Sequence, residues 1–456
     1  MNNVVKNIGA GSWGRLSTIL FKLCQVPLLL SYLSTEDYGR WLILYSLPSW
    51  LAYASQGFGS VAANEIPISV AAGKLPVAQR VYATSFAFMV LLTVGGMLLT
   101  LTVAPLIPWD RFLELEADRQ GEVVRAVVCL ALAVFLSFFS ELFYGRFRAA
   151  QLAHRSILIT SFQNWIELLF LFVALQFTTA LDHLAYAMVA AICVYLLAYG
   201  WLSYRAYSRL RFRWKLVRVR EFRVLFFKGF AFQAFPLGNA LLFQGNLLAV
   251  QLMLGPTAVA LFGTARTLVR VVNQALELIS KSIWPELSYL FGAGKAAGVR
   301  RLHRLGLGLC VTLSVLGVGG LSLLGGWLYQ LWVGESIALP HWLLLLFLLP
   351  IPFNALWLTS STVLMASNQH TYLARRYLLA TTTAAIGCAV LTYFFGLGGA
   401  AVSTLIADLI LIPYVVTRVL ELTDDTLGGL LSGAVEQTKA VCRQALHTLR
   451  PAGTTE

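Results

Sequence analysis

The sequence predicts an all-α integral membrane protein with about twelve transmembrane helices, in two parallel six-helix lobes with a central cationic cavity. The first reason is composition, because 58% of the 456 residues are hydrophobic and 12% are charged, against roughly 25% charged residues in soluble domains. The second is that the apolar residues form blocks of ~20 residues or more, each able to cross a ~30 Å hydrocarbon core as a helix. The third is a short internal repeat with one copy in each half of the chain.

The apolar blocks follow one another with short polar connections. Their approximate bounds are 8–33, 38–62, 80–107, 123–144, 154–178, 184–206, 224–253, 257–283, 304–333, 339–366, 371–395 and 398–420. The first block is longer than a signal-peptide core and no small-residue cleavage site follows it, so we expect it to remain as a spanning helix. We therefore predict an N-terminal lobe at 1–206, a basic linker at 207–223, a C-terminal lobe at 224–422 and an amphipathic tail at 423–456.

Successive loops alternate in charge. One set is basic and the other is acidic or bare, with Glu114 and Glu116 in the longest acidic loop. Because basic residues collect in cytoplasmic loops, we predict that both termini are cytoplasmic and that the tail lies on the inner surface. This asymmetry accounts for most of the formal net charge of +13, so no nucleic-acid partner is expected. The largest basic run either orients the linker or binds an acidic partner or anionic headgroups; it comprises Arg205, Arg209, Arg211, Arg213, Lys215, Arg218, Arg220, Arg223 and Lys228.

The internal repeat supports two similar lobes. The segment EIPISVAAGKLPVAQR, which ends at Arg80, aligns with ELSYLFGAGKAAGVRR, which ends at Arg301, so that a Glu, a Gly-Lys pair and the last Arg coincide. Each copy follows the second helix of a six-helix half. An even number of helices per half gives both copies the same orientation, and substrate is then expected at the interface between the halves.

Two predicted spans carry cations at membrane depth. In the first, Arg15 and Lys22 share one side with Thr18 and Gln25, and in the eighth Arg266 and Arg270 form a stripe with Asn273 and Glu277. Four lipid-exposed cations would cost on the order of 10–14 kcal/mol, so both stripes should line a common cavity. We predict that Arg15, Lys22, Arg266 and Arg270 bind a multivalent anion such as pyrophosphate. The alternative is that they bridge helices or, for Arg15, extend to the inner surface.

Several residues at depth are candidates for coupling or gating. They are Glu141, Glu167, Asn273, Glu277 and Asp408. Each carboxylate either exchanges a coupling ion, H+ or Na+, or serves as a counter-ion for the cavity arginines. The seventh span, with several Asn and Gln residues, either bends with one wet side or holds helices together.

No cysteines or histidines have the spacing of metal ligands, so we predict no metal site. No cofactor is expected apart from the coupling ion. The longest outer loop, residues 108–122, is acidic and has neither His nor Ser. Because no nucleophile, base or metal set appears, we predict that the protein is not an enzyme.

Two motifs resemble a known family. They are the opening KNIGAGSWGRLSTILFKLCQVPLLLSYLSTEDYGRW and the later LGPTAVALFGTARTLVRVVNQALELISKSIWPELSYLFGAGK. With them the chain resembles the polysaccharide transporter family of the multidrug/oligosaccharidyl-lipid/polysaccharide flippase superfamily, which contains the O-antigen flippases. The resemblance implies two six-helix lobes, alternating access and a cationic lumen, in the bacterial cytoplasmic (inner) membrane. Members often have an acidic residue near the position of Asn246, and the asparagine here leaves the coupling ion open.

The same resemblance implies the substrate and the partners. The substrate is expected to be a polyprenyl-diphosphate-linked oligosaccharide, such as an O-antigen or lipopolysaccharide repeat unit, moved by an ion antiporter. Membrane lipids and other polysaccharide-assembly membrane proteins are the expected partners. The main alternative is a multidrug or metabolite exporter of the same superfamily, for which the basic stripes are the wrong charge. A membrane glycan polymerase or ligase is a more distant alternative, because the outer loops are short.

Overall fold

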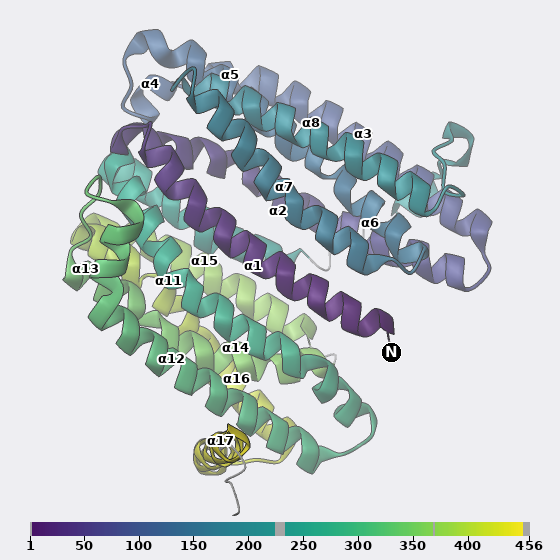
Figure 1. Ribbon diagram of the computed structural model, residues 1–456, viewed down its shortest axis with the longest axis vertical. Coiled ribbons are helices and arrows are strands. Elements are labelled where there is room, and N and C mark those ends of the chain that lie inside the picture. Colours follow the sequence, from purple (N-terminus) through teal and green to yellow (C-terminus); the bar gives the residue numbers. More distant parts are fainter. Residues whose placement is uncertain (1, 224–232, 368–369, 450–456) are drawn as a thin grey trace, which may run out of the picture. The chain divides into compact units, whose positions relative to one another are not determined.

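The computed structural model describes residues 2–223, 233–367 and 370–449, and in these ranges the chain is built of helices joined by turns, with no strand (Figure 1). The all-α membrane class predicted from the sequence is confirmed. The first part of the seventh predicted span, residues 224–232 with Lys228, lies outside the described residues.

The helices follow the predicted spans closely. The first are α1 (Asn2–Leu30), α2 (Thr35–Ala71), α3 (Leu75–Val103), the short α4 (Trp109–Phe112), α5 (Gln120–Ser137), α6 (Phe139–Ala149), α7 (Ala153–Leu175) and α8 (Leu181–Ala206). Then come α10 (Ala234–Ala240), the π-helical η4 (Leu241–Gly245), α11 (Asn246–Gly292), α12 (Ala296–Val333), α13 (His341–Leu348), α14 (Pro350–Ala366), α15 (His370–Val402), α16 (Thr404–Thr423) and α17 (Leu427–Leu449). Single turns form η1 (Ala104–Leu106), η2 (Ala117–Arg119) and η3 (Trp214–Leu216).

Two long helices each contain the turn between two predicted spans. Gly255 in α11 has φ 78° and Gly396 in α15 has φ 57°, a backbone conformation that glycine adopts without steric cost. Among the described residues, eight helical segments are long and apolar enough to cross a membrane, and one of them includes both spans joined at Gly255. The remaining predicted spans are α1, α2 and α16, so the described helices account for all twelve.

The chain folds into two compact units. The first unit contains Met1–Gly263 and Trp332–Ile337, and the second contains Thr264–Leu331 and Ala338–Glu456. In the first unit α2 packs on α3, α5 and α6, while α8 lies along α5 and α1 along α7 (Figure 1). Its core includes the fully buried side chains of Met89, Leu142 and Leu210. The first unit therefore extends past the predicted linker and includes the described part of the seventh span.

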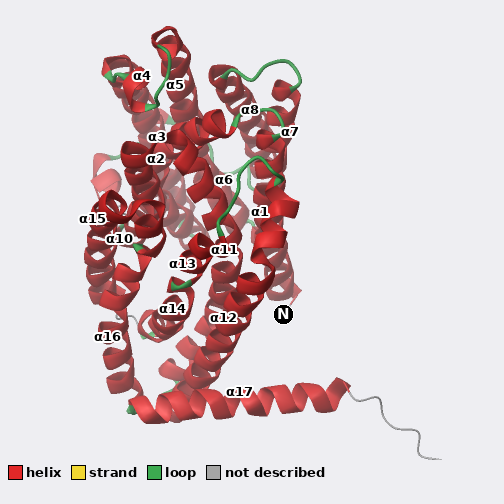
Figure 2. Cartoon of the chain, turned by 90° about the vertical axis from the view of Figure 1, so that its left-hand side faces the viewer, coloured by secondary structure: helices red, strands yellow, loops and turns green. Residues whose placement is uncertain are grey.

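In the second unit α16 packs against α14 and α15. The tail helix α17 follows a sharp turn and lies across the ends of α12 and α16 (Figure 2). Arg304 of α12 fixes this turn, because its guanidinium donates to both carboxylate oxygens of Asp425 at 2.9 and 2.6 Å. Gly308 lets α17 approach, since a β-carbon there would lie 2.4 Å from the Ala434 carbonyl oxygen.

The internal repeat has the same local structure in both copies. Gly73 and Gly294 both have positive φ, 71° and 67°, and each terminates a helix. The amides of the next residues, Lys74 and Lys295, donate to the carbonyl five residues earlier at 2.9 and 3.0 Å. The sequence match therefore reflects one helix-terminating motif used twice.

Candidate functional site

The predicted stripe on α1 lies next to a polar face of α7. Helix α1 is continuous through Arg15 and Lys22, so both project from the predicted side, with Arg15 exposed and Lys22 partly buried. Between them Thr18 lies beside Asn164 of α7, with Oγ1 and Nδ2 3.5 Å apart.

A buried hydrogen-bond set joins the same two helices. Ser17 is fully buried and donates to the Ser161 carbonyl at 3.1 Å, while the Trp165 indole donates to the Ser17 hydroxyl at 2.7 Å. These contacts fix the rotation of α1 against α7. Ser17 and Trp165 were not predicted from the sequence, although Ser17 is a small polar residue directly before Thr18 of the predicted stripe.

Glu167 belongs to this polar face. Its side chain is 6% exposed and accepts a hydrogen bond from the Gln163 amide at 2.9 Å. The described contact is therefore with a neutral group. The first unit thus places a buried carboxyl and two helix cations on adjacent helices, α7 and α1.

The second stripe lies on α11 after Gly255. Arg266 and Arg270 are both partly buried. Asn273, one turn further on, has a buried Oδ1 that lacks a hydrogen-bond partner among the described residues. Because the α1 stripe and the α11 stripe lie in different compact units, their meeting in one cavity stays a prediction.

Asp408 lies in a neutral hydrogen-bond pocket of the second unit. Its side chain, on α16, is 4% exposed, and one oxygen accepts from the Trp357 indole at 2.6 Å and from the Asn354 amide at 3.3 Å, both on α14. Isolated buried charges are costly, whereas a carboxyl that can gain a proton is tolerated. Asp408 and Glu167 thus both accept hydrogen bonds from neutral donors in their described contacts.

Glu141 and Glu277 have cationic neighbours instead. Glu277 pairs with Lys281 one turn along α11 at 2.8 Å, and both side chains are substantially exposed. Glu141 packs against Gly59 of α2, and Arg148 lies on the same helix as Glu141. Neither Lys281 nor Arg148 is one of the four predicted cavity cations, so a counter-ion role for Glu141 and Glu277 toward those cations stays a prediction.

One polar residue of the seventh predicted span holds two helices together, which was one of the two alternatives for this span. Gln251 is 3% exposed, and its amide donates to the Phe112 carbonyl at 2.8 Å, which ties α11 to α4. The π-helical turn η4 just before α11 is a local irregularity of the kind at which helices bend, the other alternative for this span.

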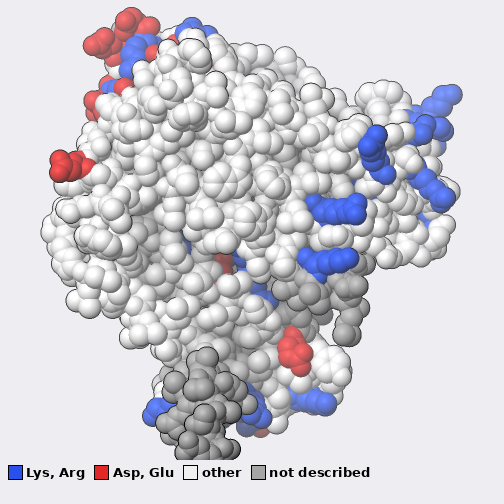
Figure 3. All heavy atoms as spheres, viewed as in Figure 1, with Lys and Arg blue, Asp and Glu red and all other residues white. Residues whose placement is uncertain are grey.

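The two ends of the first unit differ in charge. Exposed acidic side chains gather at the end with α4, where Glu114, Glu116 and Asp118 lie, whereas Lys and Arg gather at the opposite end (Figure 3). Arg205, Arg209 and the following arginines supply part of this basic end. The alternation of loop charge in the sequence is thus a real separation in space.

The sequence was compared with models of known protein families and with curated protein sequences. Residues 4–291, well over half of the chain, match the sequence model of a family described as polysaccharide biosynthesis protein. A comparison with curated protein sequences gives no significant match.

Several solved structures have the same fold. An inward-facing multidrug resistance MATE family transporter of the MOP superfamily superposes with a TM-score of 0.76 at 13% identity, covering 90% of this chain and 96% of that one. A MATE in complex with MaD3S gives 0.65 at 13% identity, covering 92% and 96%. A MOP superfamily transporter from Pyrococcus furiosus, whose binding pocket is described as having reverse polarity, gives 0.64 at 13% identity, covering 93% and 96%. These likenesses establish a MATE-like fold with two lobes.

Proposed function

Because the chain belongs to the polysaccharide biosynthesis protein family, we propose that it is a flippase that moves a polyprenyl-diphosphate-linked oligosaccharide from the inner to the outer leaflet by alternating access. The family supplies the glycan connection, and the MATE-like fold supplies a multi-pass membrane scaffold used by transporters. The proposed substrate carries a lipid-linked repeat unit, such as that of an O-antigen.

One observation carries the choice of substrate. Four cations, Arg15, Lys22, Arg266 and Arg270, lie on the helical stripes of α1 and α11, within the apolar part of the chain. Cations at this depth are retained where they meet water or an anion. A diphosphate presents several oxygens to guanidinium and ammonium donors, so it is the part of the substrate that these residues would bind.

We further propose that transport is coupled to H+ or Na+ through Glu167 and Asp408. Both carboxyls are almost fully buried, and their described hydrogen-bond donors are neutral amide and indole groups. Exchange of a proton or a sodium ion at either carboxyl changes the charge of its unit, which is how an ion gradient can drive alternating access. No other cofactor is part of the proposal.

The proposal places the protein in the bacterial cytoplasmic membrane with both termini inside. The separation of acidic and basic residues to opposite ends of the first unit supports it, because basic loops stay on the cytoplasmic side. Other polysaccharide-assembly membrane proteins are its proposed partners on that membrane.

A multidrug exporter is the second candidate, because the solved structures with this fold include multidrug transporters. The positive charge of the stripe residues favours an anionic substrate over cationic drugs, since cationic drugs need acidic binding groups. If the protein exports drugs, cells that lack it become sensitive to cationic dyes while their glycan display is normal.

The test is glycan display in cells that carry Lys22→Ala or Arg270→Ala in place of the wild type. We expect display to be lost in both while the protein remains in the membrane. The matched control is Arg418→Ala, which removes a helix cation paired with Glu421 at the surface. Normal display in both stripe variants would exclude the proposed binding role.

A further inference from the structure

The basic linker is an ordered segment bound to the end of the first unit. Leu210 is fully buried in the core cluster, and Phe212 packs against the same cluster with its ring 4.7 Å from that of Phe86. Two apolar anchors separated by one residue hold this segment in place. A purely topogenic linker needs charge but no such anchors.

Polar contacts fix the backbone of the same segment. The buried Arg146 of α6 donates to the Leu210 carbonyl at 2.6 Å, and its guanidinium lies 4.5 Å from the centre of the Tyr82 ring. From α3, the Gln79 amide donates to the Arg209 carbonyl at 3.1 Å. Helices α3 and α6 thus both hold the chain around Leu210.

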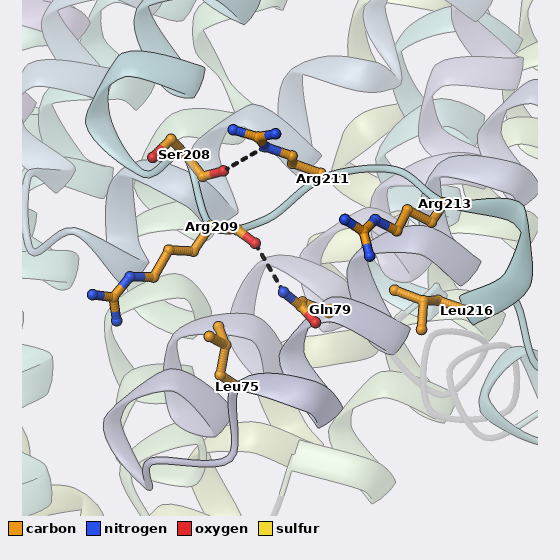
Figure 4. A pocket seen from close by; sticks show the side chains of 7 residues that line it. All are labelled: Leu75, Gln79, Ser208, Arg209, Arg211, Arg213 and Leu216. Atoms are coloured by element: carbon orange, nitrogen blue, oxygen red, sulfur yellow. Dashed lines mark hydrogen bonds between the residues drawn. The ribbon is translucent and has the colours of Figure 1, made fainter.

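Because Leu210 and Phe212 face the core, the residues that alternate with them face away from it. Arg209, Arg211 and Arg213 are exposed, while the residues between them point toward the core. The three arginines border a hollow of about 280 Å³, which is also lined by Leu75, Gln79, Ser208 and Leu216 (Figure 4). No carboxylate is among these lining residues, so the hollow is cationic.

Two exposed tryptophans lie close in the chain to the residues that line the hollow. Trp214 follows Arg213, is 69% exposed and makes an edge contact with Phe212, with ring centres 4.8 Å apart. Trp201, in the last turns of α8, is 54% exposed and has the Arg205 guanidinium 4.0 Å above its ring. Tryptophan concentrates at the membrane–water interface. The segment also follows directly after α8, which is apolar enough to span the membrane, so the hollow lies at headgroup depth.

We propose that this hollow binds the phosphate group of an anionic membrane lipid in the leaflet on the basic side. Arginine donors match phosphate oxygens, and clusters of basic residues next to spanning helices recognise anionic headgroups. The exposed Trp201 and Trp214 in the same part of the chain favour a lipid over a soluble anion, because tryptophan side chains concentrate at the membrane–water interface. The site is distinct from the stripes of α1 and α11 and does not depend on the transported substrate.

The experiment measures lipid retention on the full chain, purified in a neutral detergent, by native mass spectrometry. The protein is exposed to micelles that contain dioleoyl phosphatidylglycerol or, for comparison, dioleoyl phosphatidylcholine. We expect the wild type to retain phosphatidylglycerol preferentially. The double variant Arg211→Gln/Arg213→Gln should retain it about tenfold to thirtyfold more weakly, as expected for the loss of two cations at an anionic surface.

The matched control is Arg218→Gln/Arg220→Gln, which removes the same charge from exposed positions outside the hollow. We expect this control to change retention by less than about threefold. An equal loss in both double variants would overturn the site in favour of diffuse attraction. Equal retention of the two lipids, or complete displacement of phosphatidylglycerol by millimolar inorganic phosphate, would overturn the assignment to a lipid.

Discussion

At the scale of single residues, a glycine explains why the two family-like motifs occur together. Gly39, at the end of the first motif, lies against Pro256, at the start of the second, and a β-carbon on Gly39 would be 1.9 Å from the Pro256 carbonyl oxygen. The close approach joins α2 to α11 within the first unit. The sequence revealed the motifs but not their contact, because Gly39 and Pro256 are far apart along the chain.

Gly39→Ala should therefore destabilise the protein. The new methyl group meets backbone rather than a movable side chain, so we expect a loss of about 1–3 kcal/mol, typical of overpacking, and a lower yield of folded protein. The measurement is the thermal midpoint in detergent. Gly95→Ala on α3 is the control, since no atom lies within 4 Å of the place its new methyl group would take. Equal midpoints for the two variants would refute the role of the contact.

Asp408 and Glu167 are distinguished from the other candidate carboxylates by their neutral donors. From the sequence, the four acidic residues inside predicted spans all had the same standing as coupling candidates. The structure divides them, because Glu277 has its own lysine and Glu141 has a nearby arginine. The donors Trp357 and Asn354 could not be predicted, since they lie on another helix.

Asp408→Asn and Glu167→Gln should flatten the pH dependence of transport in proteoliposomes. Each amide retains an oxygen that accepts the same hydrogen bonds, so the fold is preserved while the exchangeable proton is lost. Glu277→Gln is the control and should leave the profile unchanged. Profiles like that of the wild type in both variants would exclude these carboxyls as coupling groups.

At the scale of elements, helix α17 is held at its start by the partly buried ion pair between Arg304 and Asp425. Burial alone would raise the pKa of the Asp425 carboxyl, but Arg304 and the Thr426 amide outweigh it and hold that pKa below its usual range. On the far side of α17, Leu427, Leu431 and Val435 are more than half exposed and form one apolar stripe. The stripe fits the predicted position of the tail on the membrane surface.

Asp425→Asn should loosen α17 and expose it to proteolysis. We expect a loss of about 1.5–3 kcal/mol at neutral pH, as for a hydrogen bond to a charged group. The lowered pKa means that the wild-type contribution is complete above pH ~4 and is lost as the pH falls through the folded-state value, so the two proteins should converge in acid.

The control for this element is Glu421→Gln, which breaks the exposed pair with Arg418 and should cost well under about 1 kcal/mol. The readout for both variants is the rate of limited proteolysis between α16 and α17 as a function of pH. Identical rates for Asp425→Asn and the wild type at neutral pH would show that the ion pair does not hold α17.

Helices were the most predictable elements, because hydrophobic length alone defines a membrane span. Their interruptions were less predictable. The fourth span breaks at Phe138 into α5 and α6, and no glycine or proline marks that position. The linker was predicted from its charge alone, although the alternation of Leu210 and Phe212 with arginines also indicates an anchored extended segment.

At the scale of the whole molecule, the internal repeat extends beyond the matched sequence. Gly73 and Gly294 stand 221 positions apart, and so do Ser34, which caps the start of α2, and Gly255, the turn within α11. Each pair marks the same point in a six-helix half. The sequence predicted the repeat from one loop. The turns at the start of the second helix of each half have different residues and were visible only in the structure.

The separation of charge along the first unit involves several loops that are far apart in the chain. The loop pattern predicted it correctly, because insertion into a membrane sorts basic residues to one side. The cation stripes were predictable for a similar reason, since α1 and the second part of α11 are continuous helices. What they bind was not predictable, because charge specifies an anion but not the glycan attached to it.

The most direct test of the account is movement of a fluorescent polyprenyl-diphosphate oligosaccharide between leaflets of proteoliposomes that contain the purified protein. We predict rapid transfer with the wild type and with Arg418→Ala, and loss of transfer with Lys22→Ala and with Arg270→Ala. Transfer at the wild-type rate in both stripe variants, or no transfer by the wild type, would contradict the account.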